Sequence, residues 1–138
     1  MKTYIALGSN LGDRELNIER AIRSMETVAG TLLASSALYY SEPQGFSSEN
    51  YFVNAVVLLD TELLPFELLE ALQQIERNLG RVAKSVDGNY SDRIIDLDIL
   101  LYEGVTMDTP ELKIPHPLMR ERDFVMKPLY ELPGEWIS

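Results

Sequence analysis

The sequence predicts an α+β fold in which helices pack on one face of an antiparallel sheet. A hydrophobic period of two residues, typical of half-buried strands, or a short aliphatic run occurs in residues 2–8, 31–41, 52–59 and 93–102. A helical period instead runs from Asp13 to Gly30 and from Leu64 to Gly80. The resulting order β-α-β-β-α-β is the ferredoxin-like, split βαβ pattern, here with a C-terminal extension.

Length and composition indicate one soluble domain. The 138 residues, 46% of them hydrophobic, can bury a core, and we expect residues 1–138 to form a single domain. The absence of cysteine excludes disulfides, and the single histidine excludes a His-rich zinc site. The sequence contains no apolar run long enough for a signal peptide or a membrane span. We therefore expect a cytoplasmic protein with no membrane partner.

The charge distribution favours a small anionic ligand. A net charge of −10 argues against a nucleic-acid partner, because phosphate backbones are bound by broad positive surfaces. Many basic residues nevertheless lie in the second half of the chain: Arg77, Arg81, Lys84, Arg93, Lys113, Arg120, Arg122 and Lys127. A locally basic cleft in an acidic protein suits a small polyphosphate better than a polymer.

The first helix has clear signals at both ends. Asp13 is well suited to cap it, and Gly30 to end it. We expect it to bury one stripe, which consists of Ile18, Ala21, Ile22, Met25, Val28 and Ala29. The preceding turn, residues 8–13, has no Lys-Ser/Thr after its second glycine, so we reject a P-loop.

The third strand contains one amide, Asn54, among aliphatic residues. A buried amide must be hydrogen-bonded, either to a neighbouring loop or to a ligand. Composition alone favours the structural interpretation over the ligand-binding one. The loop before this strand, residues 41–50, is rich in Ser, Pro and Gly.

The second helix begins at Pro65, where a missing N–H costs nothing. Its expected core stripe consists of Phe66, Leu69, Leu72, Ile75 and Leu79. The polar segment 81–93 that follows is long for a connection, as lids and binding loops often are. After the last strand we expect short extended pieces at 104–107 and 112–114 and a short helix at 118–124.

The last strand carries two carboxylates, Asp96 and Asp98. Alternation places them on one face, about 6.6 Å apart, and places Ile95, Leu97, Ile99 and Leu101 on the other face. Taken alone, this pair is as compatible with a solvated strand face as with a Mg²⁺ site. Its basic neighbours, Arg93 before it and Arg120 and Arg122 after it, favour a metal site that holds a polyphosphate.

His116 lies between Pro115 and Pro117, with further cations after it. A lone histidine is more often a structural hydrogen-bonding residue than a catalyst. We interpret this one as a hydrogen-bond donor to a phosphate group rather than a general base.

Several collinear segments resemble the 6-hydroxymethyl-7,8-dihydropterin pyrophosphokinase family of folate biosynthesis. They are Ala6–Gly12, Phe52–Ala55, Ile75–Arg81, Arg93–Leu100, Ile114–Pro117 and Arg122–Val125. Each is modest alone, but together and in order they span nearly the whole chain and are highly specific. The family's ferredoxin-like α+β fold agrees with the order of elements given above.

The resemblance implies a reaction and its cofactors. The family transfers an intact pyrophosphoryl group from ATP to the pterin's hydroxymethyl oxygen and releases AMP. Asp96 and Asp98 match the ligands of two Mg²⁺ that bridge the ATP phosphates, and Arg81 and Arg93 join them as expected catalytic residues. Our hypothesis is that metal polarisation of the hydroxyl, with Asp96 orienting it, takes the place of a general base.

The resemblance also implies two binding regions. The nucleotide region matches Gln73, Glu76, Arg81, Arg93, Ile99, His116 and Arg122. The pterin region matches Ser41, Pro43, Gln44, Phe52, Asn54, Asp96 and Phe124. In this interpretation the Asn54 amide pairs with the pterin edge while Phe52 and Phe124 sandwich the ring. The family also suggests a monomer whose partners are small molecules.

The chain departs from the family just before the Asp pair. Tyr90-Ser91-Asp92 stands where the family usually has an aromatic residue followed by Gly-Pro, and Asp92 places a negative charge beside the phosphates. Ala83 occupies a position that is often basic, a role that Lys84 can take over. We expect an active enzyme whose lid loop closes differently.

Two other functions remain as alternatives. One is another Mg²⁺-dependent nucleotidyl or phosphoryl transferase, against which the acidic charge argues where the substrate is a polymer. The other is a non-catalytic ferredoxin-like module that binds a small molecule. Such a module would not need the two Asp, Arg93 and His116 together.

Overall fold

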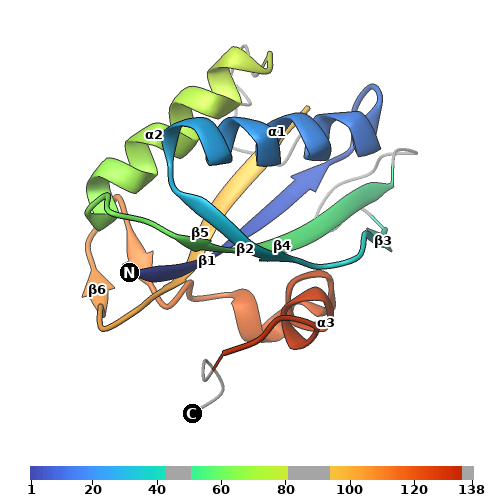
Figure 1. The fold of residues 1–138 in the computed structure, drawn as a ribbon. Coiled ribbons are helices and arrows are strands. Elements are labelled where there is room, and N and C mark those ends of the chain that lie inside the picture. Colours follow the sequence, from blue (N-terminus) through green and yellow to red (C-terminus); the bar gives the residue numbers. More distant parts are fainter. Residues whose placement is uncertain (43–50, 81–93, 135–138) are drawn as a thin grey trace.

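The computed structural model describes residues 1–42, 51–80 and 94–134 (Figure 1). Its main sheet is antiparallel, with β1 (Lys2–Ser9) paired on one side to β4 (Phe52–Asp60) and on the other to β5 (Asp96–Tyr102). On its far side, β4 pairs with β2 (Thr31–Ser35) and β3 (Tyr39–Ser41). The order is therefore β2-β4-β1-β5 with β3 beside β4, which leaves β5 as an edge strand of the described sheet.

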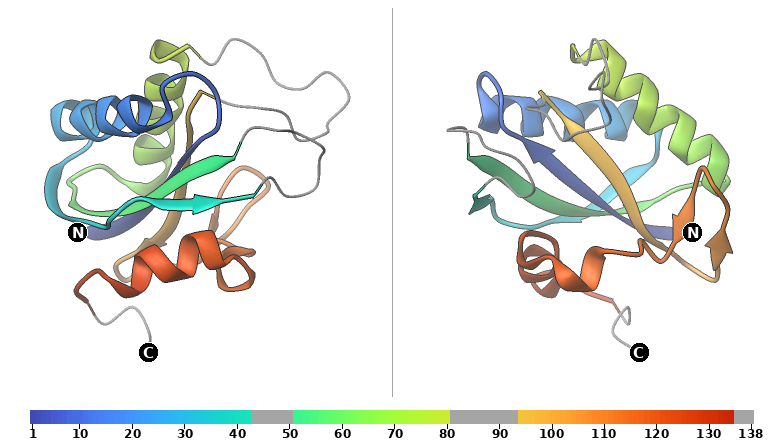
Figure 2. Two further views of the ribbon diagram at one scale, coloured as in Figure 1. Left: turned by 90° about the vertical axis from the view of Figure 1, so that its right-hand side faces the viewer. Right: turned by 180° about the vertical axis from the view of Figure 1, so that it is seen from behind.

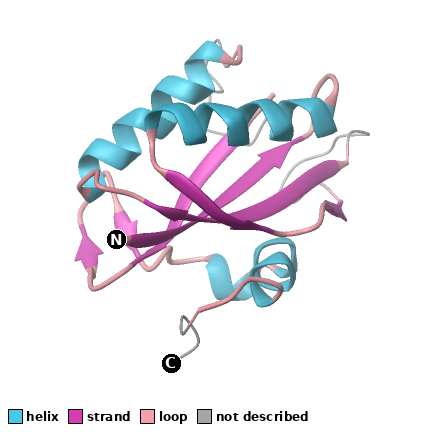
Figure 3. Ribbon diagram, viewed as in Figure 1, coloured by secondary structure: helices cyan, strands magenta, loops and turns pink. Residues whose placement is uncertain are grey.

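Helices cover both faces of this sheet (Figures 2 and 3). One face carries α1 (Arg14–Val28) and α2 (Pro65–Asn78), and the opposite face carries α3 (Asp123–Tyr130). A small hairpin, β6 (Met107–Asp108) with β7 (Lys113–Ile114), and a 3₁₀ turn at Met119–Glu121 connect β5 to α3. The predicted mixed fold with an antiparallel sheet is confirmed, but the expectation that helices occupy only one face is wrong.

Each face of the sheet has its own hydrophobic core. The larger core lies under α1 and α2 and includes the fully buried residues Ile5, Met25, Leu59, Leu68 and Ile95. The smaller core lies under α3 and includes Val56, Leu100, Met119 and Leu129. Alternation along β4 supplies both cores, because residues 53–59 are all buried.

Local signals explain where the helices begin. The Asp13 carboxylate accepts the Leu16 N–H at 3.2 Å, which confirms the predicted cap of α1. At the start of α2, the Glu67 carboxylate accepts the Leu64 N–H at 2.8 Å, and Pro65 follows in the first turn. Within the described residues no helix combines the length and apolar character needed to cross a membrane.

Tertiary packing changes several predicted details. The segment 31–41 forms two strands rather than one, and the helix expected at 118–124 is a 3₁₀ turn followed by α3. Two expected core residues are exposed, Val28 by 52% and Phe66 by 45%. A β-bulge shifts the β1–β5 register between Tyr4 and Ile5, so Leu101 packs with the α3 core and not with Leu97.

Candidate active site

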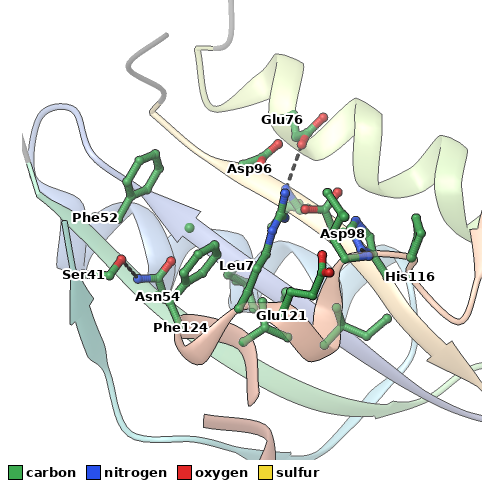
Figure 4. A pocket seen from close by; sticks show the side chains of 18 of the residues that line it. Leu7, Ser41, Phe52, Asn54, Glu76, Asp96, Asp98, His116, Glu121 and Phe124 are labelled. Carbon is green, nitrogen blue, oxygen red and sulfur yellow. Dashed lines mark hydrogen bonds between the residues drawn. The ribbon is translucent and has the colours of Figure 1, made fainter. Parts of the chain in front are cut away.

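A pocket of about 830 Å³ lies along β5, between α2 and the segment that leads into α3 (Figure 4). Most of the predicted site residues that the structure describes line it: Ser41, Phe52, Asn54, Gln73, Glu76, Asp96, Asp98, His116, Arg122 and Phe124. They come from β3, β4, α2, β5 and the segment before and within α3. Residues far apart in the sequence therefore meet in one cavity.

The two carboxylates of β5 face this pocket. Asp96 and Asp98 are partly exposed, whereas Leu97 and Ile99 are buried in the core under α1 and α2. The predicted alternation is thus confirmed for this part of the strand. Both carboxylates line the pocket.

Glu76 of α2 is a buried carboxylate, only 7% exposed, at the wall of the same pocket. It accepts the backbone N–H of Leu97, the residue between the two Asp residues, at 2.8 Å. Leu69, Gln73 and Glu76 are spaced by four and three residues, so one face of α2 lines the pocket.

His116 contributes a defined hydrogen-bond donor. Its Nδ1 accepts the Leu118 N–H at 3.2 Å, so the neutral ring carries its proton on Nε2. Partial burial and the nearby Arg122 cation lower the pKa of His116, and the Asp96 carboxylate opposes them. The ring is therefore neutral at pH 7 and can donate from Nε2 to an anionic oxygen.

The other end of the pocket is an aromatic and amide site. Asn54, 3% exposed, donates from Nδ2 to the Tyr39 carbonyl at 3.1 Å and to Ser41 Oγ at 2.8 Å. Both amide protons are used, so Oδ1 is the group that remains for a ligand. Figure 4 shows Asn54 with Phe52 and Phe124 on the same side of the pocket. At Gly8 an added Cβ would lie 3.3 Å from this Oδ1, so a side chain there would crowd the site.

Arg122 connects the two ends of the pocket. Its guanidinium lies 5.6 Å from the centre of the Phe124 ring and also lowers the pKa of His116. One cation therefore borders both the apolar end and the end that holds the Asp pair.

Other predicted residues lie elsewhere. Ile99 is 3% exposed and belongs to the core under α1 and α2, so its side chain is not part of the pocket wall. Pro43, Gln44, Arg81 and Arg93 fall outside the described residues, as do Lys84 and Tyr90–Asp92. Their assignments stay predictions.

The pocket also contains residues that the sequence analysis missed. They are Ala6, Leu7, Gly8, Glu42, Leu69, Leu97, Leu100, Glu111, Pro117, Leu118, Glu121 and Val125. The spacing of Leu69 relative to Gln73 and Glu76 is a usable signal, although the apolar stripe of the helix predicts only a core position for Leu69. Glu111 and Glu121 carry no comparable sequence signal, because exposed glutamates are common on surfaces.

The donor set suits magnesium. Mg²⁺ is usually held by one or two carboxylates, with waters and substrate phosphates completing its coordination. Asp96 and Asp98 provide such a pair. The described residues include no cluster of three or more His, Asp or Glu side chains that could hold a metal without a substrate.

Comparison with known proteins identifies the family. The family model for 7,8-dihydro-6-hydroxymethylpterin-pyrophosphokinase (HPPK) matches residues 4–134. A 2-amino-4-hydroxy-6-hydroxymethyldihydropteridine pyrophosphokinase of Porphyromonas gingivalis is 48% identical over 135 residues, 97% of this chain and 91% of the relative. The enzymes of that name from Pseudomonas aeruginosa and Bacillus subtilis are 45% and 43% identical, covering 95% and 94% of this chain and 80% and 76% of their own lengths.

Solved structures agree at the level of the fold. A crystal structure described as HPPK-DHPS in complex with substrates gives a TM-score of 0.71 at 15% identity, over 95% of this chain and 40% of that one. A Plasmodium falciparum HPPK-DHPS triple mutant gives 0.69 at 16% identity, over 93% and 40%. With the family model and the relatives above, this shows that the chain belongs to the HPPK family of pyrophosphokinases.

Proposed function

We propose that this protein transfers the pyrophosphoryl group of ATP to the hydroxymethyl oxygen of 6-hydroxymethyl-7,8-dihydropterin and releases AMP. The names of the relatives support the pterin and the pyrophosphokinase chemistry. One observation carries the proposal: a single pocket is lined by Asp96, Asp98, His116 and Arg122, and also by Asn54, which lies on the same side as Phe52 and Phe124. A nucleotide polyphosphate and a flat heterocycle both find suitable partners there.

The transfer forms one bond and breaks one. The hydroxymethyl oxygen bonds to the β-phosphorus of ATP, and the bond from that phosphorus to the oxygen bridging to the α-phosphorus breaks. The hydroxyl proton leaves to solvent, and AMP leaves with the bridging oxygen. Such a reaction requires positioning and charge neutralisation more than covalent participation of the protein.

This chain's own residues would supply both. His116 Nε2–H and the Arg122 guanidinium would donate to phosphate oxygens, and Arg81 and Arg93 are proposed to join them. Asp96 and Asp98 would hold two Mg²⁺, and Asp96 would orient the hydroxyl. When bound, these ions neutralise phosphate charge and polarise the attacking oxygen.

The pterin would bind at the amide end. The Asn54 Oδ1 would accept an N–H of the pterin edge, while Phe52 and Phe124 pack on the ring. Pro43 and Gln44 are proposed to complete this pocket, and Gln73 and Glu76 to border the nucleotide. We propose no side-chain contact for Ile99, which lies in the core.

The strand order β2-β4-β1-β5 with crossover helices α1 and α2 also supports the ferredoxin-like assignment. We further propose that residues 1–138 act as one domain, as a monomer and in the cytoplasm. Sedimentation equilibrium of the purified protein tests the monomer.

Analysis of the nucleotide product tests the reaction. Incubation with ATP, Mg²⁺ and the hydroxymethyl-dihydropterin should give AMP in equal amount to a pterin diphosphate. Asp98→Asn should lower kcat by about a hundredfold or more, because it removes charge at the transferring group. Asp108→Asn, which removes an exposed carboxylate paired with Lys113, is the matched control and should leave kcat unchanged.

Other products would refute the proposal. ADP would mean transfer of a single phosphoryl group. Mg²⁺-dependent ATP binding without turnover would favour a different acceptor, and no ATP binding would favour the small-molecule-binding module.

A further inference from the structure

Two backbone groups of β5 point away from β1, the one strand with which β5 pairs in the sheet formed by the described residues, and both are hydrogen-bonded by pocket residues. The Leu97 N–H donates to the Glu76 carboxylate at 2.8 Å, and the Leu100 carbonyl accepts the His116 N–H at 2.9 Å. Edge strands normally leave such groups to water. Here the edge is held at the stretch that carries Asp96 and Asp98.

The burial of Glu76 makes this contact unusual. A carboxylate that is 7% exposed loses most of its hydration, which is costly unless strong hydrogen bonds replace it. Hydrogen bonds from N–H groups to carboxylates are roughly twice as strong as those between neutral groups. Two further carboxylates, Asp96 and Asp98, line the same pocket and add like-charge repulsion. A glutamate kept here therefore has to make a contact that outweighs these costs.

A direct contact of Glu76 with a nucleotide phosphate is unfavourable, because both groups are anionic. Its bond is instead to the backbone N–H of Leu97, the residue between the two Asp residues of the strand. A shift of β5 at this residue would move both carboxylates at once.

We infer that Glu76 is a positioning residue, which fixes the Asp96–Asp98 stretch of β5 from α2 and thereby sets the geometry at which the pair meets its ligand. The inference deepens the proposed function and rests on it for the identity of that ligand. The contact joins two groups of the protein itself. It can therefore be tested separately from the reaction.

Two substitutions at Glu76 distinguish the effect of side-chain length from the effect of charge. Glu76→Gln keeps the chain length and an acceptor oxygen but removes the charge. Glu76→Asp keeps the charge but is one methylene shorter and draws the carboxylate away from Leu97. Glu76→Ala removes both, and Glu70→Ala is the control, because Glu70 is exposed on the same helix.

The first measurement is backbone amide exchange of Leu97 by NMR, in protein without nucleotide or metal. We expect Glu76→Gln to exchange within about threefold of the wild type, and Glu76→Asp and Glu76→Ala at least about tenfold faster, as expected for a lost bond to a charged group. Glu70→Ala should not change the rate. If Glu76→Ala does not fold, the Gln and Asp variants still decide the matter.

The second measurement is the Mg²⁺ concentration that half-saturates binding of a non-hydrolysable ATP analogue. Positioning predicts a several-fold increase for Glu76→Asp and little change for Glu76→Gln. A larger increase for Glu76→Gln than for Glu76→Asp would overturn the inference, since it would show that the charge of Glu76 matters and not the length of its side chain. Unchanged Leu97 exchange in Glu76→Ala would overturn it as well. An altered Leu97 exchange in a protein that makes no AMP would support the contact and refute only the proposed reaction.

Discussion

His116 shows at the scale of one residue how local geometry selects a chemical form. The Leu118 N–H occupies Nδ1, so the neutral ring can only donate from Nε2. Burial and Arg122 lower its pKa, which keeps this neutral form down to lower pH. The sequence predicts that His116 donates a hydrogen bond to a phosphate, and its hydrogen is on Nε2, the ring nitrogen that does not accept from Leu118.

NMR titration of His116 tests this description, and assignment is direct because the chain has one histidine. Its pKa should lie below 6.5, its ordinary value. Arg122→Gln should raise the pKa by removing a like charge, and Asp96→Asn should lower it by removing the opposing carboxylate. A pKa above 6.5 in the wild type would contradict the burial of the ring.

The same shift predicts a pH dependence of folding. Below pH 6.5 the unfolded chain binds a proton at His116 before the folded chain does, so the free energy of unfolding falls as pH drops from 6.5 to the folded pKa. Above pH 6.5 the residue is neutral in both states and contributes no pH dependence. Urea denaturation of wild type and His116→Gln across this range should show that the decline is smaller in the variant.

Asn54 shows how neighbouring acceptors can fix which way a side-chain amide is turned. Asn54→Asp would place an oxygen 3.1 Å from the Tyr39 carbonyl, where an N–H now donates. We expect a loss of about 1–3 kcal/mol in the free energy of unfolding at neutral pH, as for an unsatisfied buried group.

Ser41→Ala removes only one of the two acceptors of the Asn54 amide and should raise the KM for the pterin more than it changes kcat. Ser35→Ala, on exposed β2, is the control for both.

Element boundaries depend on close backbone approaches as well as on caps. Gly30, read from sequence as the end of α1, lies after the C-cap Ala29 and against the backbone of β4. A Cβ at Gly30 would lie 2.3 Å from the Asp60 carbonyl oxygen. The glycine is thus required by the contact between the start of β2 and the end of β4.

Gly30→Ala should therefore destabilise the protein by about 1–3 kcal/mol, the range for overpacked sites, and more if the strands cannot move apart. Thermal unfolding of this variant, compared with Thr31→Ala at the exposed neighbouring position, checks the prediction. Equal melting temperatures would mean that the β2–β4 contact adjusts without cost.

At the scale of the whole molecule, the sheet separates two cores, and the pocket uses both of its sides. The core under α1 and α2 supports Asp96, Asp98 and Glu76, whereas α3 carries Phe124. The α3 side is joined to the rest by specific bonds, including Glu131 accepting the Ala37 N–H at 3.0 Å. The smaller core therefore holds one wall of the site.

Leu129→Ala tests the importance of that core. Leu129 is fully buried in it, so truncation should cost about 2–5 kcal/mol, because it leaves a cavity. The same substitution at Leu64, which is 65% exposed, should cost far less. Chemical denaturation of both variants gives the comparison. A similar loss in the two would show that the α3 core contributes little to stability.

The sequence alone determined the order of most elements, the capping of α1 and the placement of Asp96 and Asp98 on one face of β5. These follow from short-range periodicity and from motifs whose spacing is local, such as the alternation of Asp96, Leu97 and Asp98. The resemblance to a family supplied the pairing of such segments into one site.

Only the tertiary structure decided the features that join distant residues. The placement of α3 on the opposite face, the β-bulge that turns Leu101 to the other core and the bond from Leu97 to Glu76 all depend on contacts between segments far apart in the sequence. The exposure of Phe66, an expected core residue, depends likewise on neighbours far along the chain. Hydrophobic periodicity encodes which side of an element is apolar, but not which partner will cover it.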